Sequence, residues 1–309
     1  MFSLVVASLL FAQSMLRQEQ QESSDGCSVV GVWSVDVAGG VSGVVVDPWS
    51  ATGGADRVLG VREDGSVVRI TIGMDGEASA EESGFMSRLR DAEEATLVGG
   101  QLCAWDTGDN RAERIEGVQV VCCDVPAPGE DWSEEGCLEH PIRYADGRSR
   151  DVEAVQVLAN GSAILIGKRS TPPERWLLPS FSAGVAARLD PLVSIANLGG
   201  SSANLYAAQP TAACDGDDVV LTYGALHTKQ WGSLSLPLTD LIAYEGCTRL
   251  VGDRFLLVGD ASHGDETPVV IVDCGPDQLV THSLEYHAPH AESRADRRQR
   301  RKDRRHLNN

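Results

Sequence analysis

A strand–turn–strand unit recurs along the 309 residues of this chain and limits the folds that it can adopt. Each copy has an acidic or amide entry, a short apolar run, a turn of Gly, Asp or Asn, and a second apolar run. Copies begin at Asp91, Asp151 and Ala243, a degenerate one begins at Ser202, and Ser42–Gly73 is a further copy without the acidic entry. Their starts are about 40–60 residues apart, which is the period of propeller blades.

The repeat therefore predicts an all-β protein, a β-propeller with five blades, or six as the alternative. Short apolar runs broken by turn residues suit sandwiches, barrels and propellers, and the repeat favours the propeller. The chain has 32 Gly and only 5% aromatic residues, as expected for short strands joined by tight turns. We expect an N-terminal strand near residues 29–37 to complete the last blade and close the ring, which leaves no long exposed sheet edge.

The two ends of the chain lie outside this repeat. Residues 1–15 are expected to be an export signal, because the apolar run Phe2–Phe11 is followed by small residues at a cleavage spacing. Residues 16–26 form a flexible polar spacer, 27–286 the propeller domain, and 287–309 a disordered basic tail. No later segment has about 18 continuous apolar residues, so we expect no membrane span and a secreted or periplasmic location.

Cysteine usage fits an exported protein. The chain has eight cysteines and no C-x-x-C pair, a pattern that favours disulfides over zinc in an oxidising compartment. We expect Cys214 to pair with Cys247, Cys27 with Cys274, and Cys137 with either Cys122 or Cys123.

Charge limits the kinds of partner. The net charge is −19, and the last 19 residues are locally +5, so the remainder carries about −24. Such a body repels nucleic acid and anionic membranes and attracts divalent cations. The alternative is that the bulk charge is a general adaptation for solubility or salt. We expect a monomer.

Acidic pairs with D-x-E spacing stand at the entry of two copies, Asp91/Glu93 and Asp151/Glu153. Side chains two apart on a strand project to the same side, so each pair should face the channel mouth together. Converging carboxylates repel one another unless a cation lies between them.

The sequence thus predicts a calcium site, with magnesium or manganese as alternatives. The alternative without a metal is that these acids cap turns. The predicted ligands are Asp91, Glu93, Asp106, Asp151, Glu153 and Glu245.

Several cations follow the acids in sequence and could bind an anionic or other small-molecule ligand. The predicted ligand-binding residues are Arg111, Arg150, Lys168 and Asn204, and the candidate catalytic residues are Lys168, Arg114 and Asp109. Arg114 and Arg150 could instead form salt bridges that hold blades in register. Asp109-Asn110 is expected to form a turn.

The segment Asp106-Thr107-Gly108-Asp109-Asn110, followed by Arg114, resembles the D-I-G-D-N-x-x-x-R signature of a bacterial family of exported propeller-like proteins. Two further segments resemble that family's Y-P-D-G-x-R-D-A-E-A and D-W-E-D motifs, with Ala where the family has Pro and Trp. They are residues 144–154 and 90–94. More distantly, the pattern is similar to calcium-dependent propeller phytases and a related esterase-like group. The resemblance implies a propeller fold.

Two functions are consistent with these residues. The first is an exported, calcium-binding propeller that acts as a ligand-binding or scaffold module through its channel mouth. The alternative is a calcium-dependent, phytase-like or esterase-like hydrolase of a phosphoester, ester or lactone, with metal-bound water as nucleophile. A hydrolase needs Lys168 and Arg169, or Arg111 and Arg114, aimed at a site beside the acids. A scaffold lets them point into solvent or into salt bridges.

Overall fold

The computed structural model describes residues 27–275 with gaps at 38–39, 51–54, 74–76, 87–88, 112, 115–116, 128–129, 131, 134–135, 159, 170–173, 181–186, 192–209, 215–218, 223–224, 229–231, 237–242 and 261–265. The chain divides into two units, Met1–Leu279 and Val280–Asn309, and all described residues belong to the first. The expected export signal (1–15), the spacer (16–26), the basic tail (287–309) and Asn204 lie outside the described residues. Among those described, no helix is long and apolar enough to cross a membrane.

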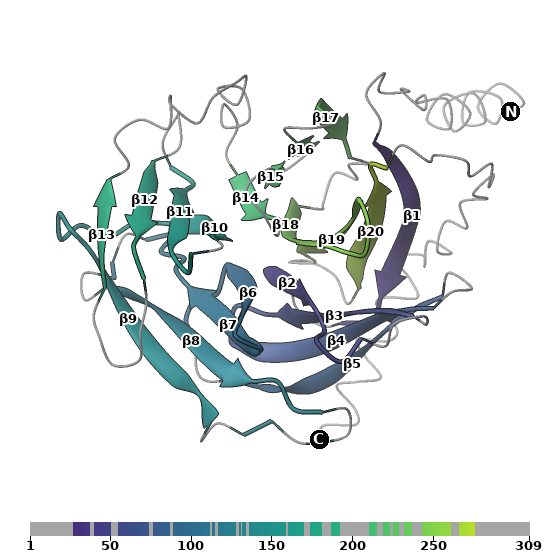
Figure 1. Ribbon diagram of the computed structural model, residues 1–309, viewed down its shortest axis with the longest axis horizontal. Coiled ribbons are helices and arrows are strands. Elements are labelled where there is room, and N and C mark those ends of the chain that lie inside the picture. Colours follow the sequence, from purple (N-terminus) through teal and green to yellow (C-terminus); the bar gives the residue numbers. More distant parts are fainter. Residues whose placement is uncertain are drawn as a thin grey trace, which may run out of the picture. The chain divides into compact units, whose positions relative to one another are not determined.

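The described residues form β-strands arranged as a β-propeller, which confirms the predicted all-β class and propeller architecture (Figure 1). The strands make four hydrogen-bonded sheets. The first contains β2 (Gly43–Val46), β3 (Asp56–Val61), β4 (Ser66–Ile72) and β5 (Ala78–Phe85). A second contains β14 (Pro210–Ala213), β15 (Val219–Thr222), β16 (Ala225–Thr228) and β17 (Gly232–Ser235).

The largest sheet has eight strands and consists of two consecutive antiparallel meanders joined by the parallel pairing of β13 with β9. The first meander is β6 (Glu94–Val98), β7 (Gln101–Asp106), β8 (Val118–Asp124) and β9 (Leu138–Tyr144). The second meander is β10 (Val152–Val157), β11 (Ala163–Gly167), β12 (Arg175–Leu178) and β13 (Ala187–Pro191).

The fourth sheet combines the two ends of the described chain. It is ordered β18 (Ala243–Arg249), β19 (Arg254–Asp260), β20 (Thr267–Asp273) and β1 (Ser28–Val35). β1 pairs antiparallel with β20, from Ser28 opposite Asp273 to Val35 opposite Thr267. The Cys27–Cys274 disulfide joins the same two strand ends across 247 residues. In the chain-entropy model, closing so long a loop stabilises the fold by on the order of 5 kcal/mol.

The first strand of each four-stranded sheet in chain order from residue 43 onward, and of each meander, lies beside the central channel. These strands are β2, β6, β10, β14 and β18. β2 contacts β6 and β18, β14 contacts β10 and β18, and β6 contacts β10. Figure 1 shows these strands nearer the middle than β5, β9, β13, β17 and β1. Gly43 permits the close approach of β2 to β6, because a Cβ at this position would collide with the backbone of Glu94 and Ala95.

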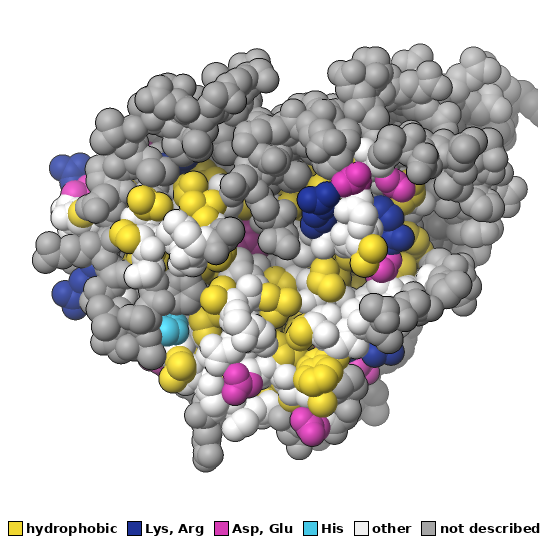
Figure 2. All heavy atoms as spheres, viewed as in Figure 1, with side chains coloured by type: hydrophobic (Ala, Val, Ile, Leu, Met, Phe, Trp, Pro, Cys, Tyr) yellow, Lys and Arg dark blue, Asp and Glu magenta, His cyan; other side chains and the backbone are white. Residues whose placement is uncertain are grey.

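The apolar core lies between neighbouring sheets. One cluster packs Leu59 and Val67 of the first sheet against Leu102 and Val121 of the eight-stranded sheet, and all four are at most 1% exposed. Burying each such side chain stabilises the fold by about 1.5–3 kcal/mol. The face shown in Figure 2 presents many apolar side chains (yellow) toward its middle, and charged side chains are scattered among them and along the edge.

Three expected disulfides are confirmed, Cys214–Cys247, Cys27–Cys274 and Cys123–Cys137. The fourth, Cys103–Cys122, joins directly paired residues of β7 and β8 and was not predicted. In the degenerate copy, the first described strand is β14 at Pro210–Ala213, later in the sequence than the expected Ser202 entry, which lies outside the described residues. Proline is tolerated at the first residue of a strand, where its missing N–H costs least.

Candidate metal centre

Three carboxylates converge just before the first strands β6 and β10. One oxygen from each of Asp91, Glu93 and Asp151 lies within 4.8 Å of the other two. Glu93 and Asp151 are buried and Asp91 is partly buried. Because β6 and β10 are in contact, the residues that enter them meet at one mouth of the channel. The structure thus brings together residues from both predicted D-x-E pairs.

Gly108, at the centre of the Asp-Thr-Gly-Asp-Asn segment, provides the room for this convergence. A Cβ at residue 108 would collide with Glu93 Oε1 and with the carboxyl group of Asp91. The Gly108 amide also donates a 3.0 Å hydrogen bond to the Asp91 carbonyl. Any side chain at this position would therefore displace the two carboxylates.

Asp106 lies beside the site and forms a buried ion pair with Arg114. Arg114 Nη1 and Nη2 lie 2.7 and 2.8 Å from the two oxygens of Asp106, whose side chain is fully buried. The same carboxylate accepts hydrogen bonds from the amides of Arg90 and Asp91 and from Gln119 Nε2. Since five donors already engage its oxygens, Asp106 fixes the backbone that carries Asp91.

Asp109 forms the expected turn and also links the two blade entries. Its carboxylate accepts hydrogen bonds from the amides of Glu113 and Arg114, at 2.9 and 3.0 Å. Its own amide donates to Asp151 Oδ1 at 2.8 Å. The turn after β7 therefore holds in place a carboxylate that enters β10.

Two cations border the cluster. Lys168 Nζ lies 2.7 Å from Glu153 Oε1, and Arg169 Nε lies 3.0 Å from Asp151 Oδ2. Arg169 also donates to the carbonyls of Asp109 and Asn110, and its side chain is 50% exposed. Both cations are therefore engaged in salt bridges beside the converging acids.

The other predicted ligand-binding residues are placed differently. Arg150 is held by Asp146 and Glu174 and stacks over the Trp176 ring at 4.6 Å. Arg150 therefore links the turn after β9 to the start of β12, which agrees with the salt-bridge role expected for this residue. Arg111 is exposed.

Burial and mutual repulsion raise the pKa values of the acids. Burial raises the pKa of Glu93 well above its usual value, and the charges of Glu153, Asp91 and Glu245 raise it further. Burial and the charge of Asp151 raise the pKa of Asp91. Burial also raises the pKa of Glu153, against the opposing effect of Lys168. The cluster therefore holds protons at a pH where free carboxyls are ionised, unless a cation replaces them.

Glu94 is a buried carboxyl that the sequence analysis did not single out. Its Oε1 accepts the amide of Ala95, and its Oε2 accepts the amide of Ala213 on β14 at 3.0 Å. Burial raises its pKa well above the usual value. The side chain thus bridges β6 and β14, which are separated by β10 around the channel. Its only sequence signal is an acid at the first position of an apolar strand.

Fold and site together define a β-propeller with a candidate metal centre at one mouth of its channel. No family model matches the sequence, and no curated protein matches it. Among solved structures 102 chains match.

Three of these matches illustrate the sequence identity and the structural similarity. The WD40 β-propeller domain of Doa1 is 11% identical, with TM-score 0.43 and coverage of 82% of this chain and 98% of that one. The PQQ-bound aldose sugar dehydrogenase of Streptomyces coelicolor is 12% identical, with TM-score 0.44 and coverage of 81% and 99%. A GDP-Man-dependent mannosyltransferase of Leishmania mexicana is 9% identical, with TM-score 0.35 and coverage of 82% and 91%.

Proposed function

We propose that this protein is an exported, calcium-binding propeller that acts as a ligand-binding or scaffold module through its acidic channel mouth. The observation that carries the proposal is the convergence of Asp91, Glu93 and Asp151 on one small space. Among the ion pairs of the described residues, none involves Asp91 or Glu93. No side-chain cation therefore occupies the place beside these two carboxyl groups, where an added cation could replace the protons that they hold.

The donors fit calcium better than zinc. All converging atoms are carboxylate oxygens, which hard cations prefer, and calcium accepts 6–8 oxygen ligands from carboxylates, carbonyls and water. Asp91, Glu93 and Asp151 would hold the ion. Glu153 and Glu245 add negative charge around it, as their effects on neighbouring pKa values indicate. Since the ligands enter both β6 and β10, the ion would stabilise the contact between two neighbouring blades.

The proposal includes five blades closed by β1. The two meanders of the eight-stranded sheet count as two blades, and the contacts among β2, β6, β10, β14 and β18 support a ring of five first strands. The pairing of β1 with β20, reinforced by Cys27–Cys274, supports closure by the N-terminal strand.

Export is supported by four disulfides among the described residues, because such bonds persist mainly in oxidising compartments. We include in the proposal the kinship with the exported propeller-like family, which rests on the Asp106–Asn110 motif and the residues around it.

A hydrolase is the second candidate. It is favoured by Arg169, whose half-exposed guanidinium stands beside Asp151 and could contact an anionic substrate. The scaffold is favoured because Arg114, Lys168 and Arg169 are all engaged with acids of the site. In the hydrolase, the ion would supply a bound water of lowered pKa.

The two candidates are separated by melting and turnover measurements on metal-stripped protein. Calcium should raise the melting temperature of the wild type, but not of Asp91→Asn, Glu93→Gln or Asp151→Asn. Asp146→Asn, which alters an exposed carboxylate outside the cluster, is the matched control. Stabilisation by calcium without phosphatase or esterase turnover supports the scaffold, and calcium-dependent turnover lost in the three variants supports the hydrolase. A melting temperature indifferent to calcium would refute both.

A further inference from the structure

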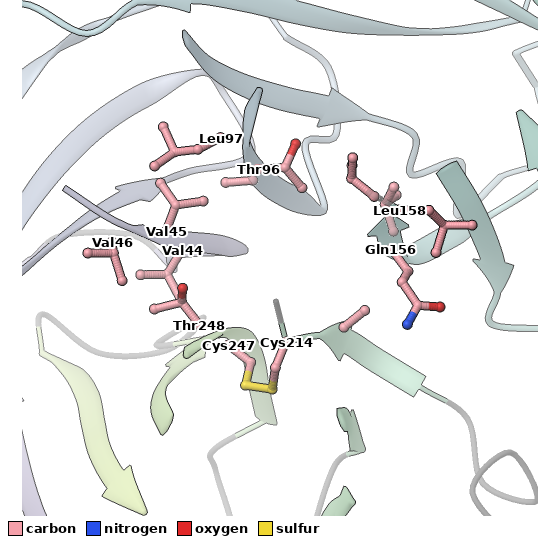
Figure 3. A pocket seen from close by; sticks show the side chains of 14 residues that line it. Val44, Val45, Val46, Thr96, Leu97, Gln156, Leu158, Cys214, Cys247 and Thr248 are labelled. Atoms are coloured by element: carbon pink, nitrogen blue, oxygen red, sulfur yellow. A yellow bond between two sulfur atoms is a disulfide. The ribbon is translucent and has the colours of Figure 1, made fainter. Parts of the chain in front are cut away.

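A cavity of about 450 Å³ lies further along the same channel (Figure 3). Each of the five first strands, or the residue directly after it, contributes to its wall. The lining residues are Val44–Val46 on β2, Ala95–Leu97 on β6, Val155–Leu158 on and after β10, Ala213 and Cys214 on and after β14, and Cys247 and Thr248 on β18. The acidic cluster precedes β6 and β10, whereas the cavity begins within them, so the two sites occupy different levels of the channel.

The cavity wall is uncharged, although the chain carries a net charge of −19. None of its described lining residues is acidic or basic, and most are aliphatic. Thr96, Gln156 and Thr248 supply the polar side chains, and Figure 3 shows the Cys214–Cys247 disulfide in the wall. An ionised ligand would lose its hydration here without a counter-charge, which costs several kcal/mol. The wall therefore selects for an uncharged molecule.

Glu94 separates this cavity from the acidic mouth. Its carboxyl accepts the amides of Ala95 and Ala213, both of which line the cavity, while Glu93 beside it belongs to the metal cluster. The hydrogen-bonded bridge thus lies between the two levels of the channel. A ligand in the cavity and an ion at the mouth would bind independently.

The volume suits a small organic molecule. Binding pockets for such molecules are typically about 300–1,000 Å³ and mainly apolar with a few polar groups. We propose that the cavity is a second binding site, for an uncharged, largely apolar small molecule.

The test uses two fluorescent probes with one skeleton. N-phenyl-1-naphthylamine is neutral, and 8-anilino-1-naphthalenesulfonate is the same skeleton with a sulfonate. The neutral probe should bind the folded full chain with one-to-one stoichiometry, at least tenfold more tightly than the sulfonated probe. A chelator should leave that binding unchanged in protein that stays folded.

Variants locate the bound probe. Val46→Phe and Val157→Phe enlarge partly buried side chains in the wall and should each weaken neutral-probe binding at least tenfold. Val29→Phe enlarges a partly buried valine on β1 that does not line the cavity, and should change binding less than twofold.

Four results would overturn the proposal. They are no neutral-probe binding by folded wild type, equal affinity for both probes, more than one probe per chain, and binding insensitive to both wall variants. The probe comparison uses wild type alone, so it stays decisive if a variant fails to fold.

Discussion

The mouth of the channel and the cavity further along it are built from the same first strands, yet one is acidic and the other uncharged. The mouth consists of residues that precede β6 and β10, where turns supply amide donors and cations. The cavity consists of strand residues whose backbone groups are used mainly by the sheet. Position within the repeat therefore separates the two chemistries. The strand entries carry charges that neighbouring turns hydrogen-bond or pair, whereas the strand residues that line the cavity carry none.

The largest expected effect is at the mouth, in the buried pair Asp106–Arg114. Arg114→Ala leaves a fully buried carboxylate without its counter-ion, and we expect the free energy of unfolding to fall by about 3–5 kcal/mol. Urea denaturation measures this loss. Arg249→Ala breaks a more exposed pair with Asp253 and should cost less than about 1 kcal/mol. Equal losses in the two variants would show that the mouth does not depend on buried charge.

The next effect concerns the space that Gly108 leaves for the carboxylates. Gly108→Ala should lower the free energy of unfolding by about 1–3 kcal/mol, because the new methyl group overlaps Glu93 and Asp91. It should also weaken calcium binding at least tenfold, with no change in neutral-probe binding to the cavity. Gly136→Ala is the matched control, since its added Cβ would meet only Asp124 at 3.9 Å. A calcium affinity unchanged by Gly108→Ala would contradict the proposed centre.

Part of this difference between mouth and cavity could be predicted from sequence. The D-x-E pairs repeat at one blade position, so their convergence follows from the period of the repeat, as does the strand–turn–strand architecture. The pairings Cys27–Cys274 and Cys214–Cys247 were also expected, the first because an N-terminal strand was predicted to complete the last blade.

The rest depended on long-range contacts that leave no periodic signal. Asp106 has the residue type of a ligand, but its role is set by Arg114 folding back onto it, which spacing does not reveal. In the sequence, Glu94 is one more acid in an acidic segment. Its role in joining β6 to β14 depends on the amide of Ala213, which is distant in sequence. The cavity arises from five strands distant in sequence, and no single segment encodes it.

The acidity of the mouth should also appear as a dependence of stability on pH. A carboxyl group whose pKa is raised by folding stabilises the fold while it is protonated, and this contribution is lost as pH rises through the folded-state pKa. Metal-free protein should therefore lose stability as pH rises above the ordinary Glu value of 4.5. Calcium binds the ionised form, so the rise in melting temperature that it causes should grow with pH.

Melting curves across this pH range, with calcium or chelator, measure the effect. Glu93→Gln is neutral at every pH and should flatten the metal-free slope, whereas Glu174→Gln, an exposed control, should retain it. The same slope in both variants would place the proton-binding groups elsewhere.

The smallest effect comes from the cation beside the cluster. Lys168→Met removes a positive charge paired with Glu153 and should tighten calcium binding about fivefold, or ~1 kcal/mol, at low salt. Titrations at low and high salt should show the gain shrinking as ions screen it. A hydrolase that uses Lys168 on its substrate would instead lose turnover in this variant.

Calorimetric titration of metal-stripped protein with calcium is the sharpest test of the proposed calcium centre. We expect one ion per chain, with binding lost in Asp91→Asn and Asp151→Asn and kept in Asp146→Asn. Absence of binding by folded wild type, or binding that survives both substitutions, would contradict a calcium centre built by the entries of β6 and β10.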